Sequence, residues 1–311
     1  MAKPGHSLNG TTDQMADALL HLACSFVGEG YGEHLTWPCT TEAEDVCNAR
    51  RQDTCFSGAC TCEHEDWTIE RLDGFVPKEN ILILTNKQQE ASVRALIKDL
   101  PPENIVAEPE KRDTAPAIAL AVGWVVTRDP TATMIVLPAD HLIKDHAQFQ
   151  RVLSNAALAA ENSGSLVTVG ITPTWACPSY GYVERGRRAS IGGLDDLPVW
   201  EVARFREKPN PDLAEHFISQ GTFLWNAGMF IWTIPAIFSE LSRHCPVLAD
   251  FISELRGSKD FSATVDKQFG KLPKLSIDYA LMERASRVLN IESTFDWDDV
   301  GDFASIAKLH A

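Results

Sequence analysis

Two acidic motifs, far apart in the chain, contain the residue types that bind a hard metal cation. Asp140 follows the apolar stretch that ends in Leu137-Pro138-Ala139, and Asp299 lies in the cluster Trp297-Asp298-Asp299 near the C-terminal end. An acid at the carboxyl end of a strand is well placed to bind Mg²⁺, which takes one or two carboxylates together with substrate phosphates. The second cluster equally fits a helix cap, and on the motif alone the cap is favoured.

The segment from Glu108 to Pro116 leads from an expected strand into an expected helix. Thr114 lies at the start of that helix and Arg112 just before it. This arrangement suits an anion or the edge of a base, because a helix N-terminus attracts negative charge. An ordinary N-cap at Asp113 or Thr114 explains the same residues, and both interpretations can hold together.

Three glycines near the N-terminus, Gly28, Gly30 and Gly32, alternate after an apolar segment. Glycines that follow a strand let backbone N–H groups approach a phosphate closely. A plain surface turn explains the same pattern, and it is favoured when the glycines are considered alone.

Two polar positions in the second half of the chain are ambiguous on their own. Glu207-Lys208-Pro209 ends an expected strand with two opposite charges, a pattern typical of a solvated surface pair. Asn226 lies in an aromatic strand, where a lone amide is more often a satisfied core group than a ligand. Neither position assigns a function by itself.

The cysteines are concentrated near the N-terminus, where six of the eight lie within the first 62 residues. Cys55, Cys60, Cys62 and His64 match no common zinc pattern, since a zinc ribbon needs two C-x2-C pairs. We therefore expect reduced thiols rather than a metal site in this segment.

The elements that must position these residues alternate between strand and helix. The apolar segment Leu19–Val27 fits a strand or one face of a helix. Apolar patterns predict strands at 81–85, 105–107, 133–137, 166–171, 180–184, 200–206 and 223–232, and helices at 91–100, 115–127, 148–162, 211–220, 235–255 and 277–285. The alternation predicts an α/β fold with βαβ units and a mixed, mostly parallel sheet flanked by helices. Ligands bind such sheets outside the carboxyl ends of the strands, where Glu108 and Asp140 are expected.

Length and charge limit the classes of function. The chain has 311 residues and a net charge of −15, which argues against a duplex-DNA coat and against an anionic membrane surface. No apolar run approaches the roughly 18 residues of a membrane span, and no signal peptide is recognised, so the cytoplasm is the expected location.

In their order along the chain, the motifs resemble those of the mannose-1-phosphate guanylyltransferases, a branch of the sugar-nucleotide pyrophosphorylases. The strings are EPEKRDTAPAIALA from Glu108, LPADHLI from Leu137, SYGYVERG from Ser179, FREKPNP from Phe205, WNAGMFIW from Trp225, SIDYALMERA from Ser276 and WDDVGDF from Trp297. Seven collinear motifs form a much stronger signal than any one alone. They cover the chain from about Thr68 to its end.

The resemblance implies a Rossmann-like nucleotide-diphospho-sugar transferase fold over residues 18–311, after an irregular leader at 1–17 and without an extended C-terminal domain. It implies formation of GDP-mannose and pyrophosphate from GTP and mannose-1-phosphate with Mg²⁺, and it leaves a homodimer open. It assigns Lys208 and Arg112 to catalysis, Asp140 and Asp299 to the metal, Gly181, Glu207 and Asn226 to the sugar, and Gly28, Gly30, Gly32, Glu108, Thr114, Ala115 and Pro116 to the nucleotide.

The region 28–67 departs from the family pattern G-G-x-G-x-R-L-W-P followed by P-K-Q. Glu29 interrupts the first glycines, His34 stands at the arginine position and Thr36 is an extra residue. No P-K-Q follows, and Arg51-Gln52 is the nearest match. Two alternatives therefore stay open: a catalytically weak or inactive sugar-nucleotide-binding homologue, and a pyrophosphorylase for another hexose-1-phosphate.

Overall fold

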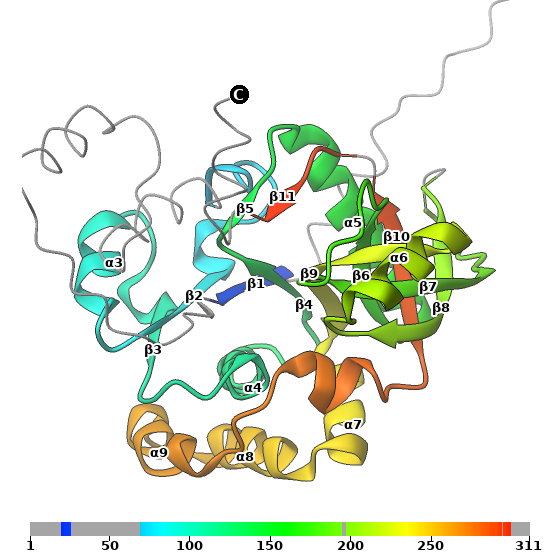
Figure 1. Ribbon diagram of the computed structural model, residues 1–311. Helices are drawn as coiled ribbons and strands as arrows, with labels where there is room; N and C mark the ends of the chain where they lie inside the picture. The colour runs from blue at the N-terminus through cyan, green and yellow to red at the C-terminus, as the bar shows by residue number, and fades with distance from the viewer. Residues whose placement is uncertain (1–19, 26–68, 195–196, 294, 300–311) are drawn as a thin grey trace, which may run out of the picture.

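A nine-stranded sheet forms the centre of the protein in the computed structural model, which describes residues 20–25, 69–194, 197–293 and 295–299 (Figure 1). The strand order is β3-β2-β1-β4-β9-β6-β10-β8-β7. The strands are β1 (Leu20–Ser25), β2 (Ile81–Asn86), β3 (Ile105–Glu108), β4 (Thr133–Pro138), β6 (Leu166–Ile171), β7 (Gly181–Arg188), β8 (Val199–Arg206), β9 (Phe223–Thr233) and β10 (Val288–Ser293).

The pairing makes the sheet mixed: among its described strands four pairings are parallel and five are antiparallel, so the expectation of a mostly parallel sheet holds only for the β3-β2-β1-β4 side and for β6 with β10. β1 is parallel to both β2 and β4, β2 is parallel to β3, and β10 is parallel to β6. β9 runs antiparallel between β4 and β6, so those two strands have the same direction. The carboxyl ends of β3, β4, β6 and β10 therefore lie at one edge of the sheet, which confirms the α/β fold class expected from the sequence.

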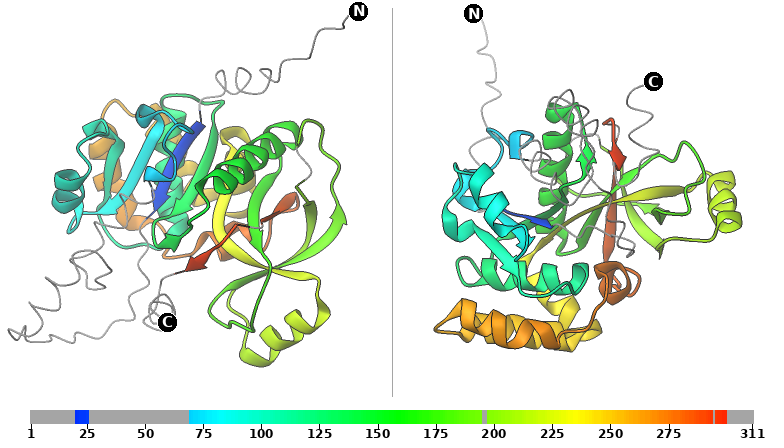
Figure 2. Two further views of the ribbon diagram at one scale, coloured as in Figure 1. Left: turned by 90° about the horizontal axis from the view of Figure 1, so that it is seen from above. Right: turned by 60° about the vertical axis from the view of Figure 1, so that its left-hand side comes forward.

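Helices cover both faces of this sheet (Figure 2). Along β2, Ile81 and Ile83 pack into one core while Leu82 and Leu84 pack into the other, because successive side chains of a strand point to opposite faces. The first core includes α3 (Glu90–Leu96), α5 (His146–Ser163) and α6 (Pro211–Gln220); the second includes α4 (Thr114–Val126), α7 (Ile234–His244), α8 (Pro246–Gly257) and α9 (Phe261–Gln268).

Three predicted helices differ from the observed ones. The helix expected at 235–255 is two helices, because Pro246 begins α8 and the backbone of Cys245 before it is not helical. The helix expected at 91–100 ends at Leu96, before the two prolines. The helix expected at 277–285 is a π-helical turn, η4 (Asp278–Met282).

Several predictions fall outside the described residues. The leader at 1–17, the segment 28–67 with its cysteines, and the glycines Gly28, Gly30 and Gly32 belong to this group. Leu20–Ser25, one of the two alternatives left open for Leu19–Val27, is a strand. Among the described residues, no helix combines the length and the apolar character needed to cross a membrane.

Candidate active site

The two acidic motifs meet through a short strand pair. β5 (His141–Leu142) and β11 (Asp298–Asp299) pair antiparallel, with Asp299 opposite His141. Asp140, His141 and Asp299 each offer one ligand atom, and these three atoms lie within 4.8 Å of one another. The structure thus brings together both residues that the sequence predicts as metal ligands, and adds His141 beside them.

His141 lies neutral in this cluster. Burial lowers its pKa to about 4; the Asp140 carboxylate opposes the shift and the positive charge of Arg71 adds to it. Its backbone carbonyl accepts a hydrogen bond from Arg71 Nη1 at 3.0 Å, and its buried Nδ1 has no hydrogen-bond partner. Two carboxylates beside a neutral imidazole fit a divalent cation, and the oxygen donors fit Mg²⁺ best.

The three predicted sugar-binding residues also lie together. Gly181 is opposite Asn226 in the pairing of β7 with β9, and Glu207 follows directly after β8. A Cβ atom on Gly181 would lie 2.5 Å from Glu207 Oε2 and 3.2 Å from Asn226 Cβ. A side chain at position 181 would therefore displace the Glu207 carboxylate from the Gly181 backbone, and glycine lets the two lie close together.

The carboxamide of Asn226 has partners on both sides. Its Oδ1 accepts hydrogen bonds from Thr168 Oγ1 at 2.7 Å and from the N–H of Gly228 at 3.3 Å. Its Nδ2 donates to Asp278 Oδ1 at 3.4 Å. The amide is thus a buried group with hydrogen-bond partners and a fixed orientation. A side chain that binds a sugar hydroxyl also requires a fixed orientation.

Aromatic rings connect the acid cluster to the strand that begins at Gly181. The ring of Trp297, two residues before Asp299, lies 5.3 Å from that of His141 and 5.3 Å from that of Tyr180, centroid to centroid. Tyr180 immediately precedes Gly181 and also contacts Trp225, at 5.2 Å. The metal-binding and sugar-binding predictions therefore belong to one neighbourhood.

The predicted nucleotide-binding segment begins with a carboxyl group that favours its neutral form. Glu108 ends β3 and is 6% exposed. Burial raises its pKa to about 8; Asp113 adds to the shift and Lys111 opposes it. A neutral carboxyl can both donate and accept a hydrogen bond, which suits recognition of a base edge.

The start of α4 packs against residues from the C-terminal part of the chain. Asp113 is the N-cap and accepts a hydrogen bond from the N–H of Thr114 at 2.7 Å, as the capping interpretation predicted. Ala115 donates its N–H to the carbonyl of Leu275 at 3.0 Å. Pro116 occupies the first turn and is buried.

Arg112 is tied to its surroundings. Its Nη2 lies 2.7 Å from a carboxylate oxygen of Glu110 and also donates to the carbonyl of Gly270. Its Nη1 donates to the carbonyl of Leu272 at 3.3 Å. In this arrangement Arg112 anchors the segment before α4, and its catalytic assignment stays a prediction.

Lys208, the other predicted catalytic residue, has an unusual backbone. Its φ of 41° lies in the left-handed region that favours glycine, and a proline follows it. The N–H of the preceding Glu207 donates to Glu283 Oε1 at 3.1 Å. Such strained positions are frequent at functional sites, where the surroundings hold the residue in place.

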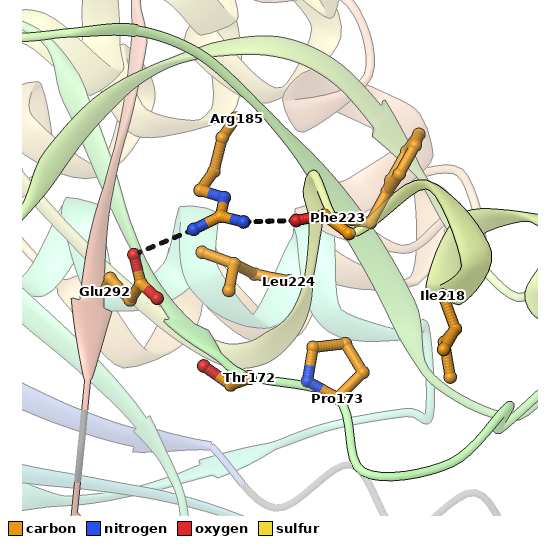
Figure 3. A pocket seen from close by; sticks show the side chains of 8 residues that line it. Thr172, Pro173, Arg185, Ile218, Phe223, Leu224 and Glu292 are labelled. Atoms are coloured by element: carbon orange, nitrogen blue, oxygen red, sulfur yellow. Dashed lines mark hydrogen bonds and ion pairs between the residues drawn. The ribbon is translucent and has the colours of Figure 1, made fainter.

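Two cavities within the described residues lie away from this neighbourhood. One of about 100 Å³ is crossed by Arg185, which pairs with Glu292 at 3.3 Å and donates to the carbonyl of Gly221 (Figure 3). A larger one of about 530 Å³ lies beside β3, α4 and α9. Neither is lined by a predicted site residue.

Sequence reasoning gave no role to three residues of the site. His141 belongs to the motif LPADHLI, whose pattern predicts a metal ligand only at the neighbouring Asp140. Asp278 and Glu283 lie in SIDYALMERA, and their contacts with Asn226 and Glu207 depend on chain folding. The signal that could have pointed to them is the presence of two acids inside a largely apolar motif.

Comparisons with known proteins show the family to which the chain belongs. A family model described as Nucleotidyl transferase matches residues 66–311. The chain is 35% identical over 269 residues to the mannose-1-phosphate guanylyltransferase of Escherichia coli (strain K12), covering 84% of this chain and 55% of that one. It is 36% identical over 270 residues to the mannose-1-phosphate guanylyltransferase ManC of Salmonella typhimurium, with the same two shares.

A solved structure supports the same family. The protein named mannose-1-phosphate geranyltransferase from Thermus thermophilus superposes with a TM-score of 0.71 at 30% identity, covering 80% of this chain and 69% of that chain. This chain spans about half the length of the curated relatives it matches. The resemblance read from the seven motifs is confirmed, and the chain belongs to the nucleotidyl transferase family of enzymes.

Proposed function

We propose that this protein is a mannose-1-phosphate guanylyltransferase that forms GDP-mannose and pyrophosphate from GTP and mannose-1-phosphate in a Mg²⁺-dependent reaction. The observation that carries the proposal is the meeting of Asp140 and Asp299, from two distant motifs, within 4.8 Å at the carboxyl-end edge of the sheet. The curated relatives named above are called mannose-1-phosphate guanylyltransferases, which supports the same substrates.

The reaction requires positioning and charge neutralisation more than covalent work by the protein. The sugar phosphate is already an anionic nucleophile, so no general base is needed to activate it. Asp140 and Asp299, with His141 beside them, would hold Mg²⁺, which when bound neutralises charge on the phosphates. The Lys208 ammonium would bind the phosphate of the sugar, and proximity would convert the encounter into an intramolecular attack.

The sugar and the nucleotide would occupy different sides of the site. The Gly181 backbone, the Glu207 carboxylate and the Asn226 carboxamide would hold sugar hydroxyls, consistent with their mutual contacts. The nucleotide would lie near Glu108 and the start of α4, from Thr114 to Pro116, with Arg112 anchoring that segment. Gly28, Gly30 and Gly32 would approach the triphosphate.

Release of pyrophosphate tests this proposal directly. Purified protein is incubated with GTP, mannose-1-phosphate and Mg²⁺, and pyrophosphate and GDP-mannose are both quantified. Parallel reactions replace GTP with ATP, UTP or dTTP, and mannose-1-phosphate with glucose-1-phosphate. We expect turnover to be highest with GTP and mannose-1-phosphate. Preference for glucose-1-phosphate would support a pyrophosphorylase for a different hexose-1-phosphate, and preference for another nucleotide would contradict the assignment of GTP.

The departures in region 28–67 support a second candidate, a homologue that binds the sugar nucleotide with little or no turnover. Titration of GDP-mannose into the protein, followed by calorimetry, distinguishes this candidate from the enzyme. Binding without release of pyrophosphate from GTP would favour it. The absence of both binding and turnover would contradict both candidates. A homodimer and a cytoplasmic location remain expectations.

A further inference from the structure

A nine-residue stretch of the chain, Leu275–Glu283, contacts both halves of the proposed site. It contains the π-helical turn η4, and none of its residues has a role in the function proposed above. Single π-helical turns are rare in proteins, and those that occur often lie at functional sites. We refer to residues 275–283 as the bridging segment.

On the nucleotide side, the bridging segment is fixed by three hydrogen bonds. The N–H of Leu275 donates to the carbonyl of Arg112 at 3.3 Å, and Leu275 accepts the N–H of Ala115 at 3.0 Å. The N–H of Ile277 donates to Thr114 Oγ1 at 2.7 Å. The segment therefore forms one structural unit with the start of α4.

On the sugar side, two carboxylates of the same segment hold two of the predicted sugar ligands. Asp278 Oδ1 accepts from Asn226 Nδ2 at 3.4 Å, which fixes which end of that carboxamide points toward η4. Glu283 Oε1 accepts the backbone N–H of Glu207 at 3.1 Å. This second contact fixes the backbone directly before Lys208.

Charged groups from three places act electrostatically on the Asp278 carboxyl. Lys208 follows β8, Asp113 precedes α4 and Glu283 ends the bridging segment itself. Asp278 is partly exposed to solvent, but protein atoms crowd its carboxyl group. The resulting desolvation is the largest influence on the pKa of Asp278 and raises it to about 6. The Lys208 ammonium favours the ionised form, whereas Asp113 and Glu283 disfavour it.

Backbone geometry independently points to the same location. Within the described residues, Asp113 (φ 71°) and Lys208 (φ 41°) are the non-glycine residues with positive φ. Such a conformation costs on the order of 1–3 kcal/mol and persists only where the surroundings enforce it. Both strained residues are electrostatic neighbours of Asp278.

We propose that Asp278 is a positioning residue for the sugar phosphate: its carboxylate orients the Asn226 carboxamide and holds the Lys208 ammonium toward the substrate, from a segment that is bonded to the nucleotide-binding loop. This inference rests on the function proposed above. In this role the Asp278 carboxylate is a fixed anion. It keeps the Asn226 carboxamide and the Lys208 ammonium in the geometry that a sugar-1-phosphate needs.

The Asp278→Asn variant tests this role, because it keeps the shape of the side chain and removes its charge. We expect KM for mannose-1-phosphate to rise by at least about tenfold, the size expected when a hydrogen bond to a charged group is lost. KM for GTP should stay within about twofold, since the backbone contacts of Leu275 and Ile277 remain. The matched control is Asp250→Asn on α8, an exposed acid far from the site in the sequence, which should leave both constants unchanged.

A pH profile separates positioning from a merely structural role. The wild-type KM for mannose-1-phosphate should rise below about pH 6 as Asp278 is protonated, and this rise should be smaller in Asp278→Asn. Because a substrate phosphate also titrates near pH 6, the comparison is made between the two proteins on the same substrate. If Asp278→Asn does not fold, Asp278→Glu replaces it, and a smaller sugar-specific rise in KM is expected.

Two outcomes would overturn the inference while leaving the proposed function intact. One is unchanged kinetics in Asp278→Asn when the wild type is active, and the other is an equal rise in both KM values. If the wild type shows no turnover, calorimetric titration of GDP-mannose and GTP into both proteins replaces kinetics, with a loss expected only for GDP-mannose. Failure of the wild type to bind either ligand would overturn the proposed function and this inference together.

Discussion

The metal prediction depends on two side chains, the carboxylates of Asp140 and Asp299. Their ligand atoms lie close together, so removing either charge should abolish Mg²⁺-dependent turnover while leaving the fold intact. We expect Asp140→Asn and Asp299→Asn each to lose activity and to lose binding of Mn²⁺ as measured by paramagnetic resonance. Thermal unfolding should be close to that of the wild type.

Asp298→Asn is the matched control for this pair. Asp298 carries the same charge in the same two-residue strand, but it is outside the cluster whose ligand atoms converge. It should retain both Mn²⁺ binding and turnover. Normal turnover in Asp140→Asn or Asp299→Asn would remove that residue from the metal site.

Glu108 provides a prediction about stability and pH. Its pKa is about 8 in the folded protein, above the ordinary value near 4.5, so the folded state keeps a proton that the unfolded state releases between those values. Stability from this residue is therefore greatest below about pH 4.5, falls as pH rises to about 8, and stays low above it.

The substitution Glu108→Gln should remove the loss of stability that the Glu108 carboxyl causes as the pH rises. At pH 9 we expect the variant to exceed the wild type in free energy of unfolding by about 2 kcal/mol or more, and at pH 5 by much less, because each pKa unit corresponds to about 1.4 kcal/mol. Chemical denaturation at both pH values measures this. Glu254→Gln, an exposed acid on α8, is the control. An equal effect at both pH values would show that Glu108 is ionised throughout.

Single residues of the site differ in how far the sequence predicts them. Asp140 follows an apolar stretch and Asp299 lies in an acidic cluster, and their meeting follows once the strands are placed. Asp278 and His141 could not be assigned in this way, because their roles depend on a hydrogen bond and on a cluster formed between distant segments. The strained φ of Lys208 also depends on its surroundings and has no sequence signature.

At the scale of elements, the packing of α4 against α8 gives a sharp test. Gly123 in α4 faces Leu255 of α8, and a Cβ atom there would contact Leu255 Cδ1 and lie 3.2 Å from Leu255 Cβ. Alanine favours a helix over glycine by about 1 kcal/mol. Overpacking a close interface costs about 1–3 kcal/mol, so we expect Gly123→Ala to destabilise the protein.

A double-mutant cycle identifies the cause. Leu255→Ala alone should destabilise by about 2–5 kcal/mol through the cavity that it leaves. Combined with Gly123→Ala, the loss should be smaller than the sum of the two, because the added methyl group enters space that Leu255 vacates. Denaturant titration of the four proteins measures the coupling. If the two losses in free energy of unfolding were additive, Gly123 and Leu255 would not be coupled, and α4 would adjust its position against α8 to accept the methyl group.

The order of the elements could be predicted well, and their ends less so. Apolar runs such as Ile81–Leu84 identify buried strands, because both faces of the sheet are covered. The apolar pattern continues across Cys245-Pro246 and therefore does not predict the break between α7 and α8. The two-residue strands β5 and β11 are too short to have a pattern, and they exist only as a pair.

At the scale of the whole molecule, the proposed function requires a protein with a net charge of −15 to bind two anionic substrates. Local cations and backbone amides must therefore outweigh the overall charge at the site. In region 28–67 the sequence departs from the family in the opposite direction. Glu29 adds a negative charge, and His34 replaces a permanent guanidinium with a side chain that is mostly neutral near pH 7. These positions lie outside the described residues, so the expectation comes from sequence alone.

Restoring the family pattern in that region should raise catalysis without changing the fold. The repaired chain carries Glu29→Gly, His34→Arg, deletion of Thr36 and Arg51→Lys. Loss of one such cation can cost roughly 10³-fold in phosphoryl-type transfer, so we expect pyrophosphate release to increase by at least about tenfold, a conservative fraction of that effect. Adding Asp140→Asn to the repaired chain should abolish the gain, because the same metal site would serve both proteins. Activity of the unmodified chain that already equals its active relatives, measured side by side, would mean that another segment supplies the missing charge to the triphosphate.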